Sequence, residues 1–396
     1  MALPFADPQF WLVTGGAAVA LVFVVRKLRR RAREESASGC DHCPKPLPPR
    51  GPRRLGALAA LALGTAGGVA AETIERQVAT MGTTLRVEVE ATTDRAAAIE
   101  LAEALIREVA AAEARLSTWR DDSELARINR APVGEWVETS AHGELVAAWQ
   151  CREATGGAFH PGVGRLVAAW DLRGTGRIPS TAEIEVARRG LDRLAYEDSN
   201  HPNRIRRLAD VVLEEGAFGK GAGLDAALRA MERLSSKGTE FLRLDLGGQV
   251  AWANAARPVV VDLADPRDRA RPVLELTLDG RRGSLASSGN SEKRFNFNDE
   301  SFGHLLDPRT GRPARDFGAA AVVARDALAA DCLSTALFVM GPDEGSRWLA
   351  QQESLFEAVY LVVEGERLRA KLTPGLAKRA RPLVADLVIE ELKGSS

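Results

Sequence analysis

Residues 327–341 read ALAADCLSTALFVMG, and this stretch is the most informative part of the sequence. Its apolar residues continue over four turns, which predicts a long helix from about Ala327 to Met340 that Gly341-Pro342 ends. Asp331 and Thr335 are four residues apart and therefore share one face of this helix. A carboxylate in an otherwise apolar helix needs a structural or chemical reason.

The Asp331 and Thr335 pair has two explanations from sequence. Oxygen ligands at positions i and i+4 suit magnesium, which prefers carboxylate, carbonyl and hydroxyl oxygens and often bridges to substrate phosphates. The same pair could instead make a helix cap or a buried hydrogen bond. The pair alone leaves both explanations open.

A glycine-rich stretch, GAFGKGAG, lies upstream at residues 216–223. Small residues let backbone amides approach a phosphate, and Lys220 adds a positive charge. The spacing is not that of a Walker A loop, so a glycine-rich helix start without a ligand is the alternative.

A loop at residues 303–311, GHLLDPRTG, places His304 three residues before Asp307 among proline and glycine turn signals. His304 is a candidate general base. Alternatively, His304 is an ordinary turn residue and Asp307 caps the turn.

The order of predicted elements favours an α+β fold. Residues 84–92 alternate as a strand with one buried face, Asp94 can cap the following helix, and Ser180 with Glu183 forms a capping box for another. Helices and strands mix without regular β-α-β alternation, so residues 72–396 are treated as one α+β domain. Further strands are predicted near residues 241–246, 259–263, 274–278 and 319–323.

The first 71 residues predict membrane targeting. Residues 1–26 contain an apolar run from Phe10 to Val25, which predicts a transmembrane helix, and residues 27–54 are basic and proline-rich. Residues 55–71 form a second apolar, signal-like or transmembrane segment. We therefore expect residues 72–396 to lie on the periplasmic side of a bacterial inner membrane. Cys40 and Cys43 form a C-x-x-C, a pattern that can bind a metal or act as a redox pair but here lacks a second pair of ligands.

Composition excludes some classes of protein. The formal net charge of −1 provides no overall basic field for nucleic acid. Four cysteines are too few for a disulfide scaffold, and Cys151 and Cys332 lie in apolar helical patterns as small core residues.

Several motifs, taken in order, resemble the ApbE family of FAD:protein FMN transferases. The resemblance spans nearly all of residues 72–345. It is carried by Met81-Gly82-Thr83, Ser117 to Arg120, Ser123 to Leu125, Ile128-Asn129, Ala158 to Gly164, Trp170-Asp171, Gly219-Lys220-Gly221 with Asp225, Ser287 to Gly289, His304 to Gly311 and Ala330 to Gly341.

The resemblance implies a fold related to the T-fold and a set of site residues. Asp331, Thr335 and the backbone carbonyl of Ala217 would hold Mg²⁺, and His304 and Asp331 would be the catalytic residues. The residues that would line the FAD pocket are Met81, Trp119, Ala158, Phe159, His160, Glu214, Lys220 and Leu306.

By the same resemblance, the enzyme would use magnesium to transfer the FMN moiety of FAD to a threonine or serine hydroxyl of an acceptor flavoprotein, releasing AMP. The acceptor would be an electron-transfer protein near the membrane. Two alternatives stay open: an FAD pyrophosphatase that gives FMN and AMP, and a membrane-anchored module that binds FAD without cleaving it.

The sequence departs from the family pattern at a few positions. His160 and Gly162 stand where the family usually has Asp and Thr, and residues 214–217 read EEGA in place of DLGG. Gln249 stands where an aspartate is common. These departures predict altered flavin affinity or acceptor preference.

Overall fold

The structure, a computed structural model, describes residues 72–91, 94–193, 203–234, 239–254, 257–291, 293–297, 300–352 and 356–392. The two predicted membrane segments and the pair Cys40 and Cys43 lie outside these residues. Within the described ranges, no helix has both the length and the apolar character needed to cross a membrane.

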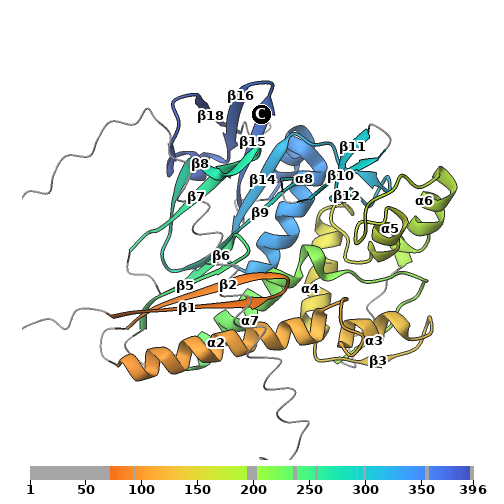
Figure 1. Ribbon diagram of the computed structural model, residues 1–396, viewed down its shortest axis with the longest axis horizontal. Coiled ribbons are helices and arrows are strands. Elements are labelled where there is room, and N and C mark those ends of the chain that lie inside the picture. Colours follow the sequence, from red (N-terminus) through yellow and green to blue (C-terminus); the bar gives the residue numbers. More distant parts are fainter. Residues whose placement is uncertain are drawn as a thin grey trace, which may run out of the picture. The chain divides into compact units, whose positions relative to one another are not determined.

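A nine-stranded sheet forms the centre of the fold, in the order β1-β2-β5-β6-β9-β14-β15-β16-β18 (Figure 1). Neighbouring strands are antiparallel except for β16 and β18, which are parallel. The strand expected at residues 84–92 is β2, although β1 precedes it. The strands are β1 (Glu72–Thr80), β2 (Thr83–Ala91), β5 (Thr239–Leu246), β6 (Gln249–Ala253), β9 (Arg282–Gly289), β14 (Gly318–Ala324), β15 (Glu357–Glu364), β16 (Arg367–Leu372) and β18 (Leu387–Glu391).

Three helices cover one face of this sheet: α2 (Arg95–Leu116), α7 (Gly219–Leu234) and α8 (Ala327–Leu349). The Asp94 side chain caps α2 as predicted, accepting hydrogen bonds from two backbone amides. Gly341 has a φ of 72° and interrupts α8 where a stop was predicted, but a second helical segment continues directly to Leu349. The predicted stop is therefore a kink.

A smaller antiparallel sheet packs on the opposite face, in the order β17-β8-β7. Alternate residues of the main strands point to the two faces, so Leu285 and Ala321 meet the small sheet while Ala286 and Val322 meet the helices. The strands of the small sheet are β7 (Val259–Asp265), β8 (Asp268–Leu278) and β17 (Ala380–Pro382).

Most of the remaining elements form a helical region and two hairpins beside α8 (Figure 1), whereas the short helix α9 (Pro374–Ala377) packs on β15 and β18. The Ser180 and Glu183 capping box begins α6, as predicted. With a mostly antiparallel sheet and helices on one of its faces, the mixed α and β class expected from sequence is confirmed. These elements are α3 (Glu124–Arg130), β3 (Val137–Glu138), α4 (His142–Ala154), α5 (Gly164–Ala169), α6 (Thr181–Arg188), β4 (Arg204–Ile205), β10 (Arg294–Phe297), β11 (Glu300–Gly303), β12 (Leu306–Asp307), β13 (Arg312–Pro313) and α9 (Pro374–Ala377).

Candidate functional site

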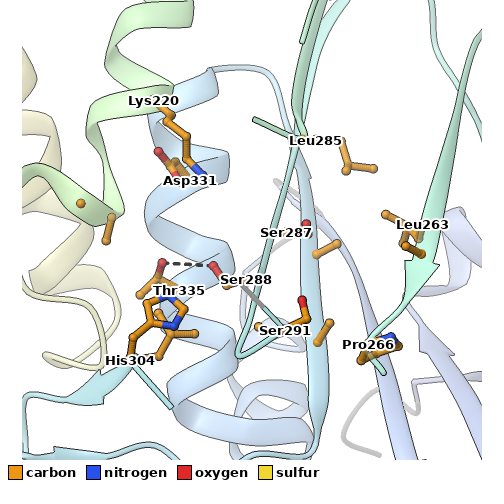
Figure 2. Close-up of a pocket in the computed structure, with 18 of the residues that line it drawn as sticks. Lys220, Leu263, Pro266, Leu285, Ser287, Ser288, Ser291, His304, Asp331 and Thr335 are labelled. Atoms are coloured by element: carbon orange, nitrogen blue, oxygen red, sulfur yellow. Dashed lines mark hydrogen bonds between the residues drawn. The ribbon is translucent and has the colours of Figure 1, made fainter. Parts of the chain in front are cut away.

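The site is built where the first turn of α7 crosses α8. The Gly221 amide donates a hydrogen bond to Asp331 Oδ2 over 2.9 Å. A Cβ atom at Gly221 would stand 2.4 Å from the Ala327 carbonyl oxygen, so only glycine permits this close approach. The glycine-rich stretch is thus a helix start, and it brings Lys220 to the Asp331 carboxylate (Figure 2).

A cavity of about 830 Å³ opens beside this crossing and gathers most of the residues that the sequence pointed to. Met81 is the exception, because it lines an adjoining cavity of about 680 Å³. The two cavities share the lining residues Trp119, Gly216, Lys220 and Arg269. The predicted residues that line the larger cavity are Trp119, Ala158, Phe159, His160, Glu214, Ala217, Lys220, His304, Leu306, Asp331 and Thr335.

The Asp331 carboxylate is buried at the wall of this cavity. Burial raises its pKa, while the positive charge of Lys220 and the hydrogen bond from Gly221 act in the opposite direction. A bound cation would stabilise the ionised carboxylate at this position.

The oxygen donors around Asp331 fit a magnesium ion. Thr335 Oγ1 lies 3.2 Å from Ser288 Oγ, which is also 2.9 Å from Ser334 Oγ. No cluster of three or more His, Cys, Asp or Glu side chains that could hold a metal occurs in the described ranges. One carboxylate and one hydroxyl suit Mg²⁺, which completes its shell with water and substrate phosphate.

His304 follows β11 and lines the same cavity as Thr335 (Figure 2). Its Nδ1 is 3.2 Å from the Lys293 carbonyl oxygen, and an Nδ1–H donated there makes Nε2 the basic nitrogen of the neutral ring. Asp307 does not assist it: its carboxylate accepts from the Arg309 amide and pairs with the Arg309 guanidinium. The turn-capping alternative is therefore right for Asp307.

The two departures at His160 and Gly162 fit each other. The buried His160 ring accepts a hydrogen bond from the Gly162 amide at Nδ1, over 2.9 Å, and its Nε2 lies 2.7 Å from the Leu191 carbonyl oxygen. A Cβ atom at Gly162 would stand 3.0 Å from the His160 ring. A side chain at position 162 would thus crowd the imidazole, and one of the two would have to shift.

Gln249 has a structural explanation outside both cavities. It is buried, and its Nε2 donates to the Ala327 carbonyl oxygen at 2.8 Å and to Ser284 Oγ at 3.3 Å. An ionised aspartate has no proton for these bonds. Gln249 therefore secures the start of α8 and does not line the candidate flavin pocket.

Arg173 also lines the larger cavity, and no local sequence pattern indicates it. Its guanidinium pairs with Glu214, which is 41 residues away, and stacks on Trp119. Burial raises the pKa of Glu214, as does the charge of Glu215, while Arg173 lowers it. Periodicity and local spacing cannot indicate contacts between segments so far apart.

Comparison with known proteins gives a consistent result. A family model described as the ApbE family matches residues 81–360. A curated relative, "FAD:protein FMN transferase" from Haemophilus influenzae, is 28% identical over 303 residues, covering 72% of this chain and 84% of the relative. The relative of the same name from Salmonella typhimurium is 29% identical over 323 residues, covering 78% of this chain and 89% of the relative.

Solved structures share the fold. The crystal structure of the ApbE protein from Thermotoga maritima superposes with a TM-score of 0.65 at 28% identity, covering 74% of this chain and 94% of that one. The apo flavinyl transferase ApbE from Pseudomonas stutzeri gives a TM-score of 0.67 at 22% identity, covering 78% of this chain and 97% of that one.

Proposed function

This chain belongs to the ApbE family and is a transferase, and we propose that it moves the FMN moiety of FAD to a hydroxyl side chain of an acceptor flavoprotein. The observation that carries this proposal is the shared cavity of Asp331, Thr335, Lys220 and His304. It combines a buried carboxylate, a half-buried hydroxyl, a lysine for phosphate and a candidate base. The relatives' name supplies the substrate that such a set of groups would act on.

Asp331, Thr335 and the carbonyl of Ala217 are the residues that would hold Mg²⁺. When bound, the ion would supply positive charge to offset the negative charge of the pyrophosphate oxygens. Lys220 adds a second positive charge beside Asp331, and Ser288 orients the Thr335 hydroxyl.

The proposed reaction is an in-line displacement at the FMN phosphorus. The oxygen of a threonine or serine hydroxyl forms the new P–O bond, the bond from that phosphorus to the bridging pyrophosphate oxygen breaks, and AMP leaves. His304 Nε2 takes the hydroxyl proton, which contributes about 10²–10⁴-fold in rate.

The location of the enzyme is part of the proposal. The apolar runs at residues 10–25 and 55–71, with arginines beside them, support anchoring in a bacterial inner membrane with the transferase domain on the periplasmic side. An electron-transfer flavoprotein at the same membrane surface would be a suitable acceptor.

The test incubates the purified full-length chain with FAD, MgCl₂ and a candidate acceptor domain. Flavin fluorescence on the acceptor after denaturing electrophoresis, with AMP in solution, is expected only when magnesium is present. Free FMN without a labelled acceptor would indicate the pyrophosphatase, and intact bound FAD would indicate the carrier.

Two aspartates near the start of α8 make matched variants. Asp331→Ala should abolish magnesium-dependent labelling. Asp326→Ala should leave it unchanged, because the Asp326 side chain is 61% exposed and caps no amide. Full labelling by Asp331→Ala would refute the metal assignment, and full labelling by His304→Ala would remove only the base role.

A further inference from the structure

Trp119 is held in place although it exposes 70% of its surface. The Arg173 guanidinium carbon lies 4.5 Å from the centre of the indole ring, which is the geometry of a cation–π contact. An exposed indole would otherwise sample several rotamers. Arg173 therefore restricts the orientation of Trp119.

The same guanidinium is fixed by hydrogen bonds to two separate segments of the chain. Its Nη2 donates to both carboxylate oxygens of Glu214, at 2.8 and 2.7 Å. Its Nη1 donates to the carbonyl oxygen of Thr118, the residue before Trp119, over 3.1 Å. Arg173 thus links the Trp119 segment to the segment that begins α7.

The loop that carries Arg173 is itself tightly organised. Asp171 has a φ of 51°, and its carbonyl oxygen accepts from the Gly174 and Gly176 amides, each at 3.1 Å. The preceding Trp170 donates its indole N–H to the Gly311 carbonyl oxygen over 2.8 Å. The position of Arg173 is therefore set by the fold and not only by its own contacts.

Arg173 contacts Trp119 on the side of the larger cavity only. Trp119 lines both cavities, whereas Arg173 lines the larger one and not the one that contains Met81. A planar guanidinium on one face of the indole leaves the other face for an aromatic ligand. Arg173 also places positive charge against the Glu214 and Glu215 pair, which would otherwise repel an anionic dinucleotide.

We propose that Arg173 is a positioning residue for the flavin ring: its guanidinium, bound to Glu214, clamps the Trp119 indole and so determines the affinity for FAD without taking part in the transfer step. This inference rests on the proposed function for the identity of the ligand. Unlike the proposed function, it predicts an effect on FAD binding and none on the transfer step.

The experiment measures FAD affinity by quenching of flavin fluorescence, together with KM for FAD and kcat, on the full-length chain. Arg173→Gln should raise both Kd and KM about tenfold, since it loses a cation–π contact and charge-assisted hydrogen bonds, with kcat changed less than about twofold. Arg173→Lys keeps the charge but not the planar fork, so it should recover part of the affinity.

The control is a second arginine–tryptophan pair outside both cavities. Arg206 lies over Trp136 at 4.6 Å, nearly the same separation, and neither residue lines either cavity, so Arg206→Gln loses a similar contact outside the candidate site. It should leave Kd for FAD unchanged. In a Trp119→Leu background, Arg173→Gln should cost much less than in the wild type, because the ring it holds is gone.

Two outcomes would overturn the clamp: an unchanged Kd in Arg173→Gln, or an equal loss of FAD affinity in Arg206→Gln. A fall in kcat together with an unchanged Kd in Arg173→Gln would make Arg173 a catalytic residue. The proposed function fails separately. A wild-type chain that binds FAD but transfers no FMN would contradict the transferase, while the Kd series would still test Arg173.

Discussion

The Asp225 carboxylate caps the start of α8 from a different helix: Oδ1 accepts from the Ala327 amide at 2.8 Å and Oδ2 from the Leu328 amide at 2.9 Å. The side chain of Asp326, at the N-cap position itself, makes no such bond. Asp331 follows in the next turn, so a residue of α7 fixes the helix that carries the candidate metal ligand.

Removing this cap should weaken both the fold and the metal site. We expect Asp225→Ala to lower the free energy of unfolding by about 1–3 kcal/mol, because two buried amides lose their acceptor. Magnesium affinity, measured by calorimetry in the presence of an FAD analogue, should fall as well. Asp94→Ala, which uncaps α2, should also cost stability but leave magnesium affinity unchanged; equal loss of affinity in both variants would contradict the positioning role.

Gly221 should tolerate no side chain, unlike Gly223 two residues later. Gly221→Ala would put a Cβ 2.4 Å from the Ala327 carbonyl oxygen, so α7 and α8 must separate, at a cost of about 1–3 kcal/mol and with loss of magnesium binding. Gly223→Ala meets the flexible end of Met81 at 2.9 Å and gains helix propensity, so its stability should stay within about 1 kcal/mol of wild type. Chemical denaturation of both variants tests this difference.

His160 and Gly162 should behave as a coupled pair. Gly162→Thr alone places its Cβ against the His160 ring and should destabilise the protein by about 1–3 kcal/mol. His160→Asp in the same chain removes the ring, so the double variant should recover most of the stability. Additive losses in a double-mutant cycle would show that the two departures from the family pattern are independent.

Glu214 should make the free energy of unfolding decrease as pH rises. Burial raises its pKa above the ordinary 4.5, so the folded protein holds this proton more tightly than the unfolded chain. Its contribution to stability is therefore complete below pH 4.5 and is lost as pH rises through the raised pKa. Relative to wild type, Glu214→Gln should become more stable as the pH of the denaturation experiment rises from 4.5 to about 8.

Glu183 provides a control, because its pKa is shifted in the opposite direction to that of Glu214. The hydrogen bond from Arg177 lowers the pKa of Glu183 to about 2, so its contribution is present above pH 4.5 and is lost as pH falls toward 2. Glu183→Gln should therefore show no trend relative to wild type between pH 4.5 and about 8. A similar upward trend in both variants would mean that the slope does not come from Glu214.

Regular local patterns made much of this protein predictable from sequence. The alternation in β2, the Asp94 cap of α2 and the capping box of α6 depend on neighbours within a few residues, so periodicity is enough to find them. Ordered motifs from Met81 to Gly341 were enough to identify the ApbE family, which the family match confirms. The Asp331 and Thr335 pair was visible for the same reason, since both lie on one face of one helix.

The long-range contacts of the site residues were decided by the tertiary structure alone. Asp225 caps a helix about a hundred residues later, Arg173 joins Trp119 to Glu214, and Gln249 supports the start of α8. These partners come from segments that the sheet order and the α7–α8 crossing bring together. Local sequence records which side chains a segment carries, but burial and long-range contacts determine what each side chain binds and how readily it ionises.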